Sequence, residues 1–569
     1  MTSDRKRILI ISGSLVVLSS LIVGRLFYLQ IVKGSEFNDR ITTNAGVRVS
    51  NSMFDRSSLF FTEKDGISVS AGITVNGYTI VVDKTMITKD KSPLSVIAKI
   101  VESDEKTLTQ KMSDSPSRYV DLVKHVTQSQ ADSLRTYKLA GVSLRTDKWR
   151  FYPGGTLAAR TLGFVAFKND TQEGRYGLER YYNKQLLKNQ DDIYGNFFTD
   201  VFSSINKKLK KNEYISGDIV TTLEPQVQQK LEQYLSSVRA QYSAEAAGGI
   251  VMDPTNGDII AMTYLPSFDL NDFGNVENPL VYSNPNAENV FEFGSIIKPL
   301  VMAGAIDAGV VTPETTYIDK GELTFNGQTI HNFDKKARGK ATMQDVLTQS
   351  LNTGMVFAEQ KMGKDVFKKY MLSYQIGEKT GIDLPNETHG LISNLNGTRD
   401  IEYANAAFGQ GLALTPVEVV KAFSSLANGG HLVSPRIAKS IISSDEKVNP
   451  IPRPEGPQVI SKASSETITR MLTTVVDKGI GAGHYSNPHY SIAAKTGTAQ
   501  MAMPNGGGYY ADRYMHSLFG YYPAYNPKFL VLMYLVYPKN VNYAATTLAD
   551  PFFAFSKFML NYYQVPPDR

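Results

Sequence analysis

Three short motifs occur in a fixed order along this chain of 569 residues, and a fold that uses them together must bring distant segments into one site. They are Ser295-Ile296-Ile297-Lys298, Ser350-Leu351-Asn352 and Lys495-Thr496-Gly497-Thr498. Between them they offer a nucleophilic hydroxyl, an amine that can act as a base, a second hydroxyl and a cationic anchor for an anion. These are the groups that acyl transfer through a covalent serine intermediate requires.

Ser295 begins an apolar run that extends to Ala308, which predicts a buried helix with the serine at its N-terminus. The positive end of the helix dipole favours the negative charge that develops there. Lys298 lies three residues further on, so its amine returns to the same face of the helix. A lysine in a dry pocket has a lowered pKa and can act as a base towards serine. The same pattern also occurs in polar or charged segments, at Ser3, Ser103, Ser204 and Ser444.

The second motif lies at the end of a helix predicted over residues 343–351. We expect Ser350 to pass a proton to the leaving amine of a substrate and Asn352 to position a substrate amide. Both side chains reach one cleft only from an irregular turn, because residues two apart do not share a helix face. Another interpretation stays open for this tripeptide alone, in which Asn352 caps the C-terminus of the helix.

The third motif directly follows a strand predicted over residues 490–494. We expect Lys495 and the hydroxyls of Thr496 and Thr498 to hold a substrate carboxylate. A lysine cation and hydroxyl donors together bind an anion, so the motif predicts an anionic group on the substrate.

Two further expectations concern the backbone of this motif. Gly497 removes a side chain where the substrate backbone must approach closely. The N–H groups of Thr498 and Ser295 would form an oxyanion hole. The tripeptide Lys-Thr-Gly occurs once more at residues 379–381, in a predicted loop.

The N-terminus predicts a membrane anchor. Residues 8–24 carry no charge, and apolar residues continue after Arg25 as far as Val32. A basic flank in residues 5–7 favours a cytoplasmic N-terminus. We therefore expect a cytoplasmic tail over 1–7, a single-pass signal anchor in the cell (inner) membrane over 8–32, and an extracytoplasmic catalytic domain. A cleaved signal peptide is the alternative, but no alanine precedes Ala45 to form an Ala-x-Ala cleavage site.

Composition narrows the chemistry. The chain has no cysteine, which excludes disulfides, thiolate metal sites and cysteine nucleophiles. Its seven histidines form no His-Glu-x-x-His pair and no Walker-type phosphate loop occurs, so we expect neither a metal nor a cofactor. A formal net charge of +5 over this length gives no reason to expect nucleic acid as a partner.

The order of the apolar patterns predicts an α+β fold in which helices flank a sheet. Helical spacing over residues 225–240 places Val227, Leu231, Leu235 and Val238 on one face. An Asn-Gly pair between the apolar runs 248–252 and 259–262 predicts a hairpin. Strands at 516–522 and 529–536 and a helix at 552–563 complete this half. Before it, residues 92–101 and 127–137 are predicted as short helices.

The three motifs and their order resemble the penicillin-binding proteins, whose transpeptidase domains share them with serine β-lactamases. The resemblance covers nearly the whole chain and is strongest to the class B, monofunctional type. It extends to Arg150-x-Tyr152-Pro153-x-Gly155, Gly174-x-x-Gly177-Leu178-Glu179, Pro266-Ser267-Phe268-Asp269-x-Asn271, Phe408-Gly409-Gln410-Gly411 and Thr415-Pro416. It implies a non-catalytic, elongated pedestal over residues 40–215 and a transpeptidase domain of the penicillin-binding and serine β-lactamase type over 216–569.

By this resemblance the substrate is the D-Ala-D-Ala end of a peptidoglycan stem peptide, and β-lactam antibiotics acylate Ser295. D-Ala leaves, and an amine of a neighbouring stem peptide attacks the acyl-enzyme. The implied partners are a polytopic lipid II polymerase of the shape, elongation, division and sporulation (SEDS) type and other divisome or elongasome membrane proteins. Within this family, the sequences of residues 495–500 and 519–523 favour a role in septal division over one in elongation.

Other functions stay open beside this one. An elongation-type transpeptidase and a D,D-carboxypeptidase would carry the same motifs. A scaffold that activates the polymerase is a further alternative; the intact set of catalytic residues argues against a purely structural role, but the two functions can coexist. A serine β-lactamase is disfavoured because no Glu-x-x-Leu-Asn segment is present to position a deacylating water. The chain also departs from the family pattern in two places. Phe293 replaces the usual proline, and the long pedestal motif survives only as Met53-Phe54-Asp55-Arg56, which puts pedestal contacts in doubt.

Overall fold

The computed structural model describes residues 55–87, 92–168, 171–187, 215–276, 278–325, 327–503 and 508–569. The predicted cytoplasmic tail and membrane anchor, residues 1–32, lie outside these ranges. Among the described residues, none of the helices combines the length and the apolar character that a membrane crossing needs.

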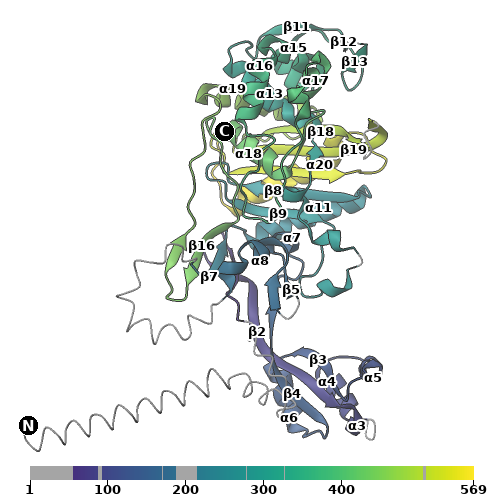
Figure 1. The fold of residues 1–569 in the computed structure, drawn as a ribbon. Coiled ribbons are helices and arrows are strands. Elements are labelled where there is room, and N and C mark those ends of the chain that lie inside the picture. Colours follow the sequence, from purple (N-terminus) through teal and green to yellow (C-terminus); the bar gives the residue numbers. More distant parts are fainter. Residues whose placement is uncertain are drawn as a thin grey trace, which may run out of the picture. The chain divides into compact units, whose positions relative to one another are not determined.

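An antiparallel five-stranded sheet organises the second half of the chain, with strand order β18-β19-β20-β8-β9 (Figure 1). Its strands are β8 (Ala246–Met252), β9 (Ile259–Leu265), β18 (Ala493–Ala502), β19 (Tyr509–Tyr522) and β20 (Phe529–Val536). Every residue of the middle strand β20 is buried. A strand covered on both faces shows a continuous apolar run in place of alternation, as β20 does.

Helices cover both faces of this sheet. Phe519 of β19 stacks on Phe423 of α18 (Pro416–Ala427), with ring centroids 3.9 Å apart. The next residue, Gly520, points to the other face, where a Cβ would lie 2.8 Å from Phe552 of α20 (Ala544–Tyr562). The helix α11 (Pro225–Gln241) packs beside α20, and α19 (Lys462–Thr474) beside α18. This arrangement confirms the predicted α+β class.

Several predicted elements are confirmed here. The helix expected over 225–240 is α11, and its four predicted apolar residues are buried. The Asn-Gly hairpin joins β8 to β9, and Gly257 there has φ +80°, a value that favours glycine. The final helix is longer than predicted, because α20 already begins at Ala544 and contains Pro551. The helix α19 ends at Thr474 and continues as a π-helical turn over Val475–Gly479.

The helical part that holds the first two motifs is built around α13 (Lys298–Asp307), which is buried from Lys298 to Ala305. A helix that is apolar all round lies inside a core. It contacts α15, α16, α18 and α19. The remaining elements of this part are α14 (Met343–Thr348), α15 (Asn352–Met362), α16 (Lys364–Ser373), α17 (Asp400–Ala406), β10 (Phe291–Glu292), β11 (Thr316–Asp319), β12 (Glu322–Phe325), β13 (Gln328–His331), β14 (Gly339–Thr342) and β15 (Ala413–Leu414).

A second sheet belongs mostly to the first half of the chain, with order β17-β16-β7-β1-β2-β3 and β4 also paired to β2. Its long strand β2 contributes Ala71 to the large core and Ile80 and Val82 to a separate small core. The elements are β1 (Leu59–Thr62), β2 (Ser68–Asp83), β3 (Tyr119–Val126), β4 (Val142–Phe151), β7 (Gly217–Thr221), β16 (Ala438–Ser443) and β17 (Val448–Pro450).

Short helices complete the small core and confirm two predictions. The helix expected at 92–101 is α4 (Ser92–Ile100), and that at 127–137 is α6 (Gln128–Thr136), which Thr127 caps in a capping box. The other short elements are α3 (Lys84–Ile87), α5 (Glu105–Asp114), α7 (Ala159–Leu162), α8 (Gly177–Tyr181), α9 (Asn183–Leu186), β5 (Val165–Lys168) and β6 (Thr171–Gly174).

A buried ion network joins the three family stretches of the first half. Arg56 Nε lies 2.6 Å from Glu179 Oε2, and Arg150 Nε lies 2.6 Å from Glu179 Oε1. Burial alone would raise the pKa of Glu179, but the two guanidinium groups hold it below its ordinary value. The contact of Arg56 is therefore present although most of the surrounding motif is missing from the sequence.

Candidate active site

The candidate nucleophile lies on a tight turn rather than at the start of a regular helix. Residues Gly294–Ile297 form a 3₁₀-helix, and the α-helix α13 begins only at Lys298. Gly294 has φ +63°, and a Cβ on it would lie 2.9 Å from the carbonyl oxygen of Thr498. The single helix predicted from Ser295 to Ala308 is therefore wrong in its first turn, because residues 294–297 form a 3₁₀-turn whose left-handed glycine lies close to β18.

Lys298 is fully buried, and its amine makes three hydrogen bonds to the second motif. Its Nζ donates to the carbonyl oxygen of Ser350 at 2.7 Å, to Asn352 Oδ1 at 2.8 Å and to Ser350 Oγ at 3.2 Å. Burial, and then the nearby charge of Lys495, lower the pKa of Lys298 well below its ordinary value. A neutral amine has only two N–H donors, which the two carbonyl-type oxygens use, so the Ser350 hydroxyl then donates to its lone pair, the group that takes up a proton.

Lys495 contacts the same hydroxyl from β18. Its Nζ lies 3.0 Å from Ser350 Oγ and 2.9 Å from the carbonyl oxygen of Thr496. Burial lowers the pKa of Lys495 to about 7. The Ser350 hydroxyl thus lies between two amines of lowered pKa, and a proton can move between them through it.

The second motif is the irregular turn that its expected chemistry requires. The predicted helix 343–351 is too long, since α14 ends at Thr348 and Ser350 has φ +54°. A left-handed serine costs on the order of 1–2 kcal/mol, and the surrounding hydrogen bonds hold it. Asn352 is the first residue of α15, so the alternative in which it caps the end of a helix is wrong.

The third motif lies inside a strand and does not follow one. The predicted strand 490–494 is wrong in its bounds, because β18 begins at Ala493 and continues through the motif to Ala502. Apolar residues alone mark a strand poorly when its second half faces a polar site. By the two-residue period of a strand, Thr496 and Thr498 share one face, and Lys495 shares the other with Gly497.

Gly497 makes room for the nucleophile turn. A Cβ at this position would lie 2.5 Å from the Phe293 carbonyl oxygen and 2.5 Å from Ser517 Oγ. The expected close approach is therefore made by the protein's own backbone. Ser517, which pairs with Gly497 across β18 and β19, donates to the Phe293 carbonyl oxygen at 3.0 Å. Sequence reasoning missed Ser517, although a serine after His516 interrupts an otherwise apolar strand.

Thr498 contacts both the nucleophile turn and α20. Its Oγ1 accepts from the N–H of Ala544, the first residue of α20, at 3.1 Å, which leaves the hydroxyl proton free to donate. Its carbonyl oxygen faces Gly294, and the N–H and C=O of one strand residue point to the same side. Because β18 is an edge strand, the Thr498 N–H also faces the nucleophile turn.

The structure thus links Lys298, Ser350, Asn352 and Lys495 by direct hydrogen bonds, and places Ser295 and Gly497 at the contact between turn and strand. The repeated patterns lie elsewhere. Thr380 of the second Lys-Thr-Gly donates to Glu387 Oε1 at 2.6 Å within a loop, as predicted. Ser103 and Ser444 are exposed, whereas Ser3 and Ser204 lie outside the described residues.

Phe293, which replaces the usual proline, fills a space in the core. It is 1% exposed, and its ring meets that of Tyr534 on β20 edge to face at 5.9 Å. An aromatic pair of this kind stabilises the packing beyond its buried area. The phenylalanine that departs from the family pattern therefore packs the nucleophile turn against β20.

Comparison with known proteins gives the family. Residues 247–558 match the penicillin-binding protein transpeptidase domain, and residues 73–222 match the penicillin-binding protein dimerisation domain. The chain is 28% identical over 563 residues to stage V sporulation protein D of Bacillus subtilis, covering 96% of this chain and 84% of the relative. It is 26% identical over 442 residues to the peptidoglycan D,D-transpeptidase FtsI of Escherichia coli, covering 77% and 71%.

Solved structures show the same fold. Penicillin-binding protein 3 of Mycobacterium tuberculosis, complexed with aztreonam, superposes with a TM-score of 0.67 at 21% identity, covering 90% of this chain and 97% of that one. Penicillin-binding protein 2X of Streptococcus thermophilus gives 0.70 at 20% identity, covering 90% and 80%. The chain belongs to the penicillin-binding proteins and carries their transpeptidase domain together with their dimerisation domain.

Proposed function

We propose that this protein is a class B peptidoglycan D,D-transpeptidase that cross-links stem peptides through an acyl-enzyme on Ser295. One observation carries the proposal. The buried amine of Lys298 is held by the second motif, and the hydroxyl of Ser350 joins it to Lys495. Two lysines of lowered pKa around one hydroxyl are a proton-transfer system, and one of them, Lys298, lies one turn from Ser295.

In the first step Lys298 Nζ accepts the proton of the Ser295 hydroxyl while Oγ attacks the carbonyl carbon of the penultimate D-Ala. The oxygen of the tetrahedral intermediate accepts from the N–H groups of Ser295 and Thr498. The substrate carboxylate is held by Lys495 and by the hydroxyls of Thr496 and Thr498. Asn352 positions the amide of the stem peptide.

Collapse of the intermediate breaks the peptide bond. The leaving D-Ala amine takes a proton from Ser350, which recovers one from Lys298. An amine of a neighbouring stem peptide then attacks the ester of Ser295, and the same groups act in reverse. A new peptide bond forms and Ser295 Oγ is released with its proton.

The relatives and the N-terminus support a cellular role. The names of two relatives, stage V sporulation protein D and the D,D-transpeptidase FtsI, favour septal synthesis over elongation. The apolar segment 8–32 supports a single-pass anchor in the inner membrane with the catalytic domain outside the cytoplasm. We assign residues 40–215 to the pedestal and 216–569 to the transpeptidase domain. The expected partner is a SEDS-type lipid II polymerase.

Labelling with a fluorescent penicillin tests the proposed chemistry. We expect one stable covalent adduct on Ser295, absent in Ser295→Ala and in Lys298→Met. Lys379→Met, in the second Lys-Thr-Gly, is the matched control and should label normally. Label that persists in Ser295→Ala would overturn the assignment. With stem-peptide substrate, product that forms only by hydrolysis when an acceptor amine is supplied would indicate a carboxypeptidase instead.

A further inference from the structure

The helix that carries the second motif is capped from a distant part of the chain. Its own N-cap residue, Leu351, provides no side-chain acceptor for α15. Instead Asn332, in the loop after β13, accepts through Oδ1 from the N–H groups of Asn352 at 3.0 Å and Thr353 at 3.3 Å. The first N–H groups of a helix have no partner within the helix, so this contact fixes where α15 begins.

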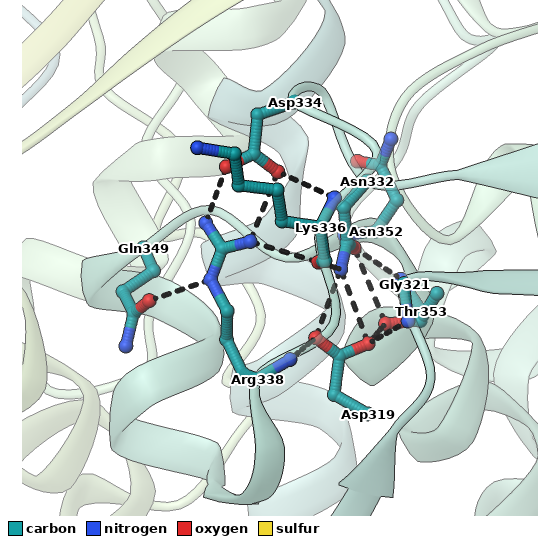
Figure 2. A network of polar contacts seen from close by, with 9 residues as sticks. All are labelled: Asp319, Gly321, Asn332, Asp334, Lys336, Arg338, Gln349, Asn352 and Thr353. Atoms are coloured by element: carbon teal, nitrogen blue, oxygen red, sulfur yellow. Dashed lines mark hydrogen bonds and ion pairs between the residues drawn. The ribbon is translucent and has the colours of Figure 1, made fainter.

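A buried carboxylate fixes the orientation of Asn332, as Figure 2 shows. Asn332 Nδ2 lies 3.1 and 3.0 Å from the two carboxylate oxygens of Asp319, at the end of β11. Asp319 also accepts from the N–H groups of Gly321 and Arg338, each at 2.9 Å, and from Thr353 Oγ1 at 2.8 Å. Asp319, Asn332 and Thr353 are each 1% exposed, so water does not substitute for these contacts.

The same loop also orients the side chain of Asn352. Asn352 Nδ2 donates to the His331 carbonyl oxygen at 2.8 Å, which turns Oδ1 towards Lys298 Nζ, also at 2.8 Å. Asn332 holds the backbone N–H of Asn352, and the carbonyl oxygen of His331 holds the side-chain amide of Asn352. The end of the β12–β13 hairpin therefore sets both the position and the direction of an acceptor for the buried lysine.

We propose that Asp319 and Asn332 are positioning residues for the acylation of Ser295, acting through Asn352 on Lys298. The inference rests on the proposed function, in which Lys298 is the base. Neither residue contacts the nucleophile. Among the described residues, the charged side chain that acts on Lys298 is Lys495 from β18, and the ring of His331 is turned to Glu322, with Nδ1 and Oε2 3.2 Å apart.

The test is the rate constant for acylation by a fluorescent penicillin, measured from pH 5 to pH 9. We expect Asn332→Ala to lower it roughly 10- to 100-fold, the effect of a small misplacement of a reacting group. The acid limb of the profile should move to higher pH, because loosened acceptors admit water and favour the protonated amine. Thr329→Val, which removes an exposed hydroxyl on the same hairpin, is the matched control and should keep the wild-type profile.

Folding defects are separated from positioning because the rate constant is measured on the molecules that label. A variant that only unfolds loses labelled protein without a change in rate constant or pH profile. Asn332→Asp places a second carboxylate opposite Asp319 and removes the donor between them, so its rate constant for acylation should be lower than that of the wild type. Combining it with Asp319→Asn restores a donor opposite the acceptor and should recover part of the rate.

Two results would overturn the positioning role. They are a wild-type rate constant and pH profile in Asn332→Ala, and a double variant no faster than Asn332→Asp alone. Label that persists in Ser295→Ala would instead refute the proposed function itself, so the two failures are distinguishable.

Discussion

Replacing Lys495 by methionine should make the protein more stable at neutral pH while impairing catalysis. Lys495 is 2% exposed, and burial lowers the pKa of its amine from 10.5 to about 7. An unfolded chain binds the proton more tightly than the folded one, so the lysine opposes folding at pH 7. At about 1.4 kcal/mol for each pH unit between the two pKa values, the opposing term is on the order of 4–5 kcal/mol.

The hydrogen bonds of Lys495 reduce the expected gain. Its contacts with Ser350 Oγ and the Thr496 carbonyl oxygen each contribute about 1 kcal/mol net. Methionine is similar in length and apolar, so little packing is lost. Lys495→Met should therefore raise the free energy of unfolding by roughly 2–3 kcal/mol at pH 7.

Denaturant unfolding of the wild type and Lys495→Met at pH 7 and pH 10 measures the effect. The wild type gains stability as pH rises from about 7 towards 10.5, since the folded lysine is then neutral and the unfolded one loses its proton. The variant lacks this dependence, so its advantage should shrink at pH 10. A variant less stable than the wild type at pH 7, or a difference that does not change with pH, would refute the reasoning.

Three further outcomes are expected. Gly497→Ala should slow acylation at least about tenfold, because its Cβ would displace the nucleophile turn; Gly274→Ala, which meets no atom within 4 Å, is the control, and equal rates would contradict this. Glu179→Gln leaves two buried guanidinium groups without a counter-charge and should cost about 3–5 kcal/mol, seen as a lower melting temperature; an unchanged value would argue against the network. The affinity for a penicillin with a free carboxylate should fall as pH rises through about 7, where Lys495 loses its charge, whereas its methyl ester should show no such fall.

The sequence predicted the elements whose signal is local. The apolar face of α11 and the Asn-Gly hairpin follow from periodicity and turn chemistry. The motif residues could be chosen over their repeats because Ser295 opens an apolar run, whereas Ser103 and Ser444 lie among charges.

What the sequence could not show depends on contacts between distant segments. Nothing near Ser350 marks it as left-handed, because the surrounding tertiary hydrogen bonds impose that conformation. The partners Ser517 and Asn332 were missed for the same reason. Each is an ordinary polar residue in its own segment, and its role comes from a neighbour far away in the chain.

The contact between the nucleophile turn and β18 determines when the site can exist during synthesis. Ser295 and Lys298 are made early, but the strand that supports their turn begins at Ala493 and its partner β19 ends at Tyr522. In a growing chain whose residues 493–522 have not yet left the ribosome, the nucleophile turn lacks Lys495, the Thr498 N–H and the hydrogen bond from Ser517. The reactive serine therefore becomes functional only after residues 493–522 have been made, and a chain cut short before Ala493 carries its nucleophile without the means to use it.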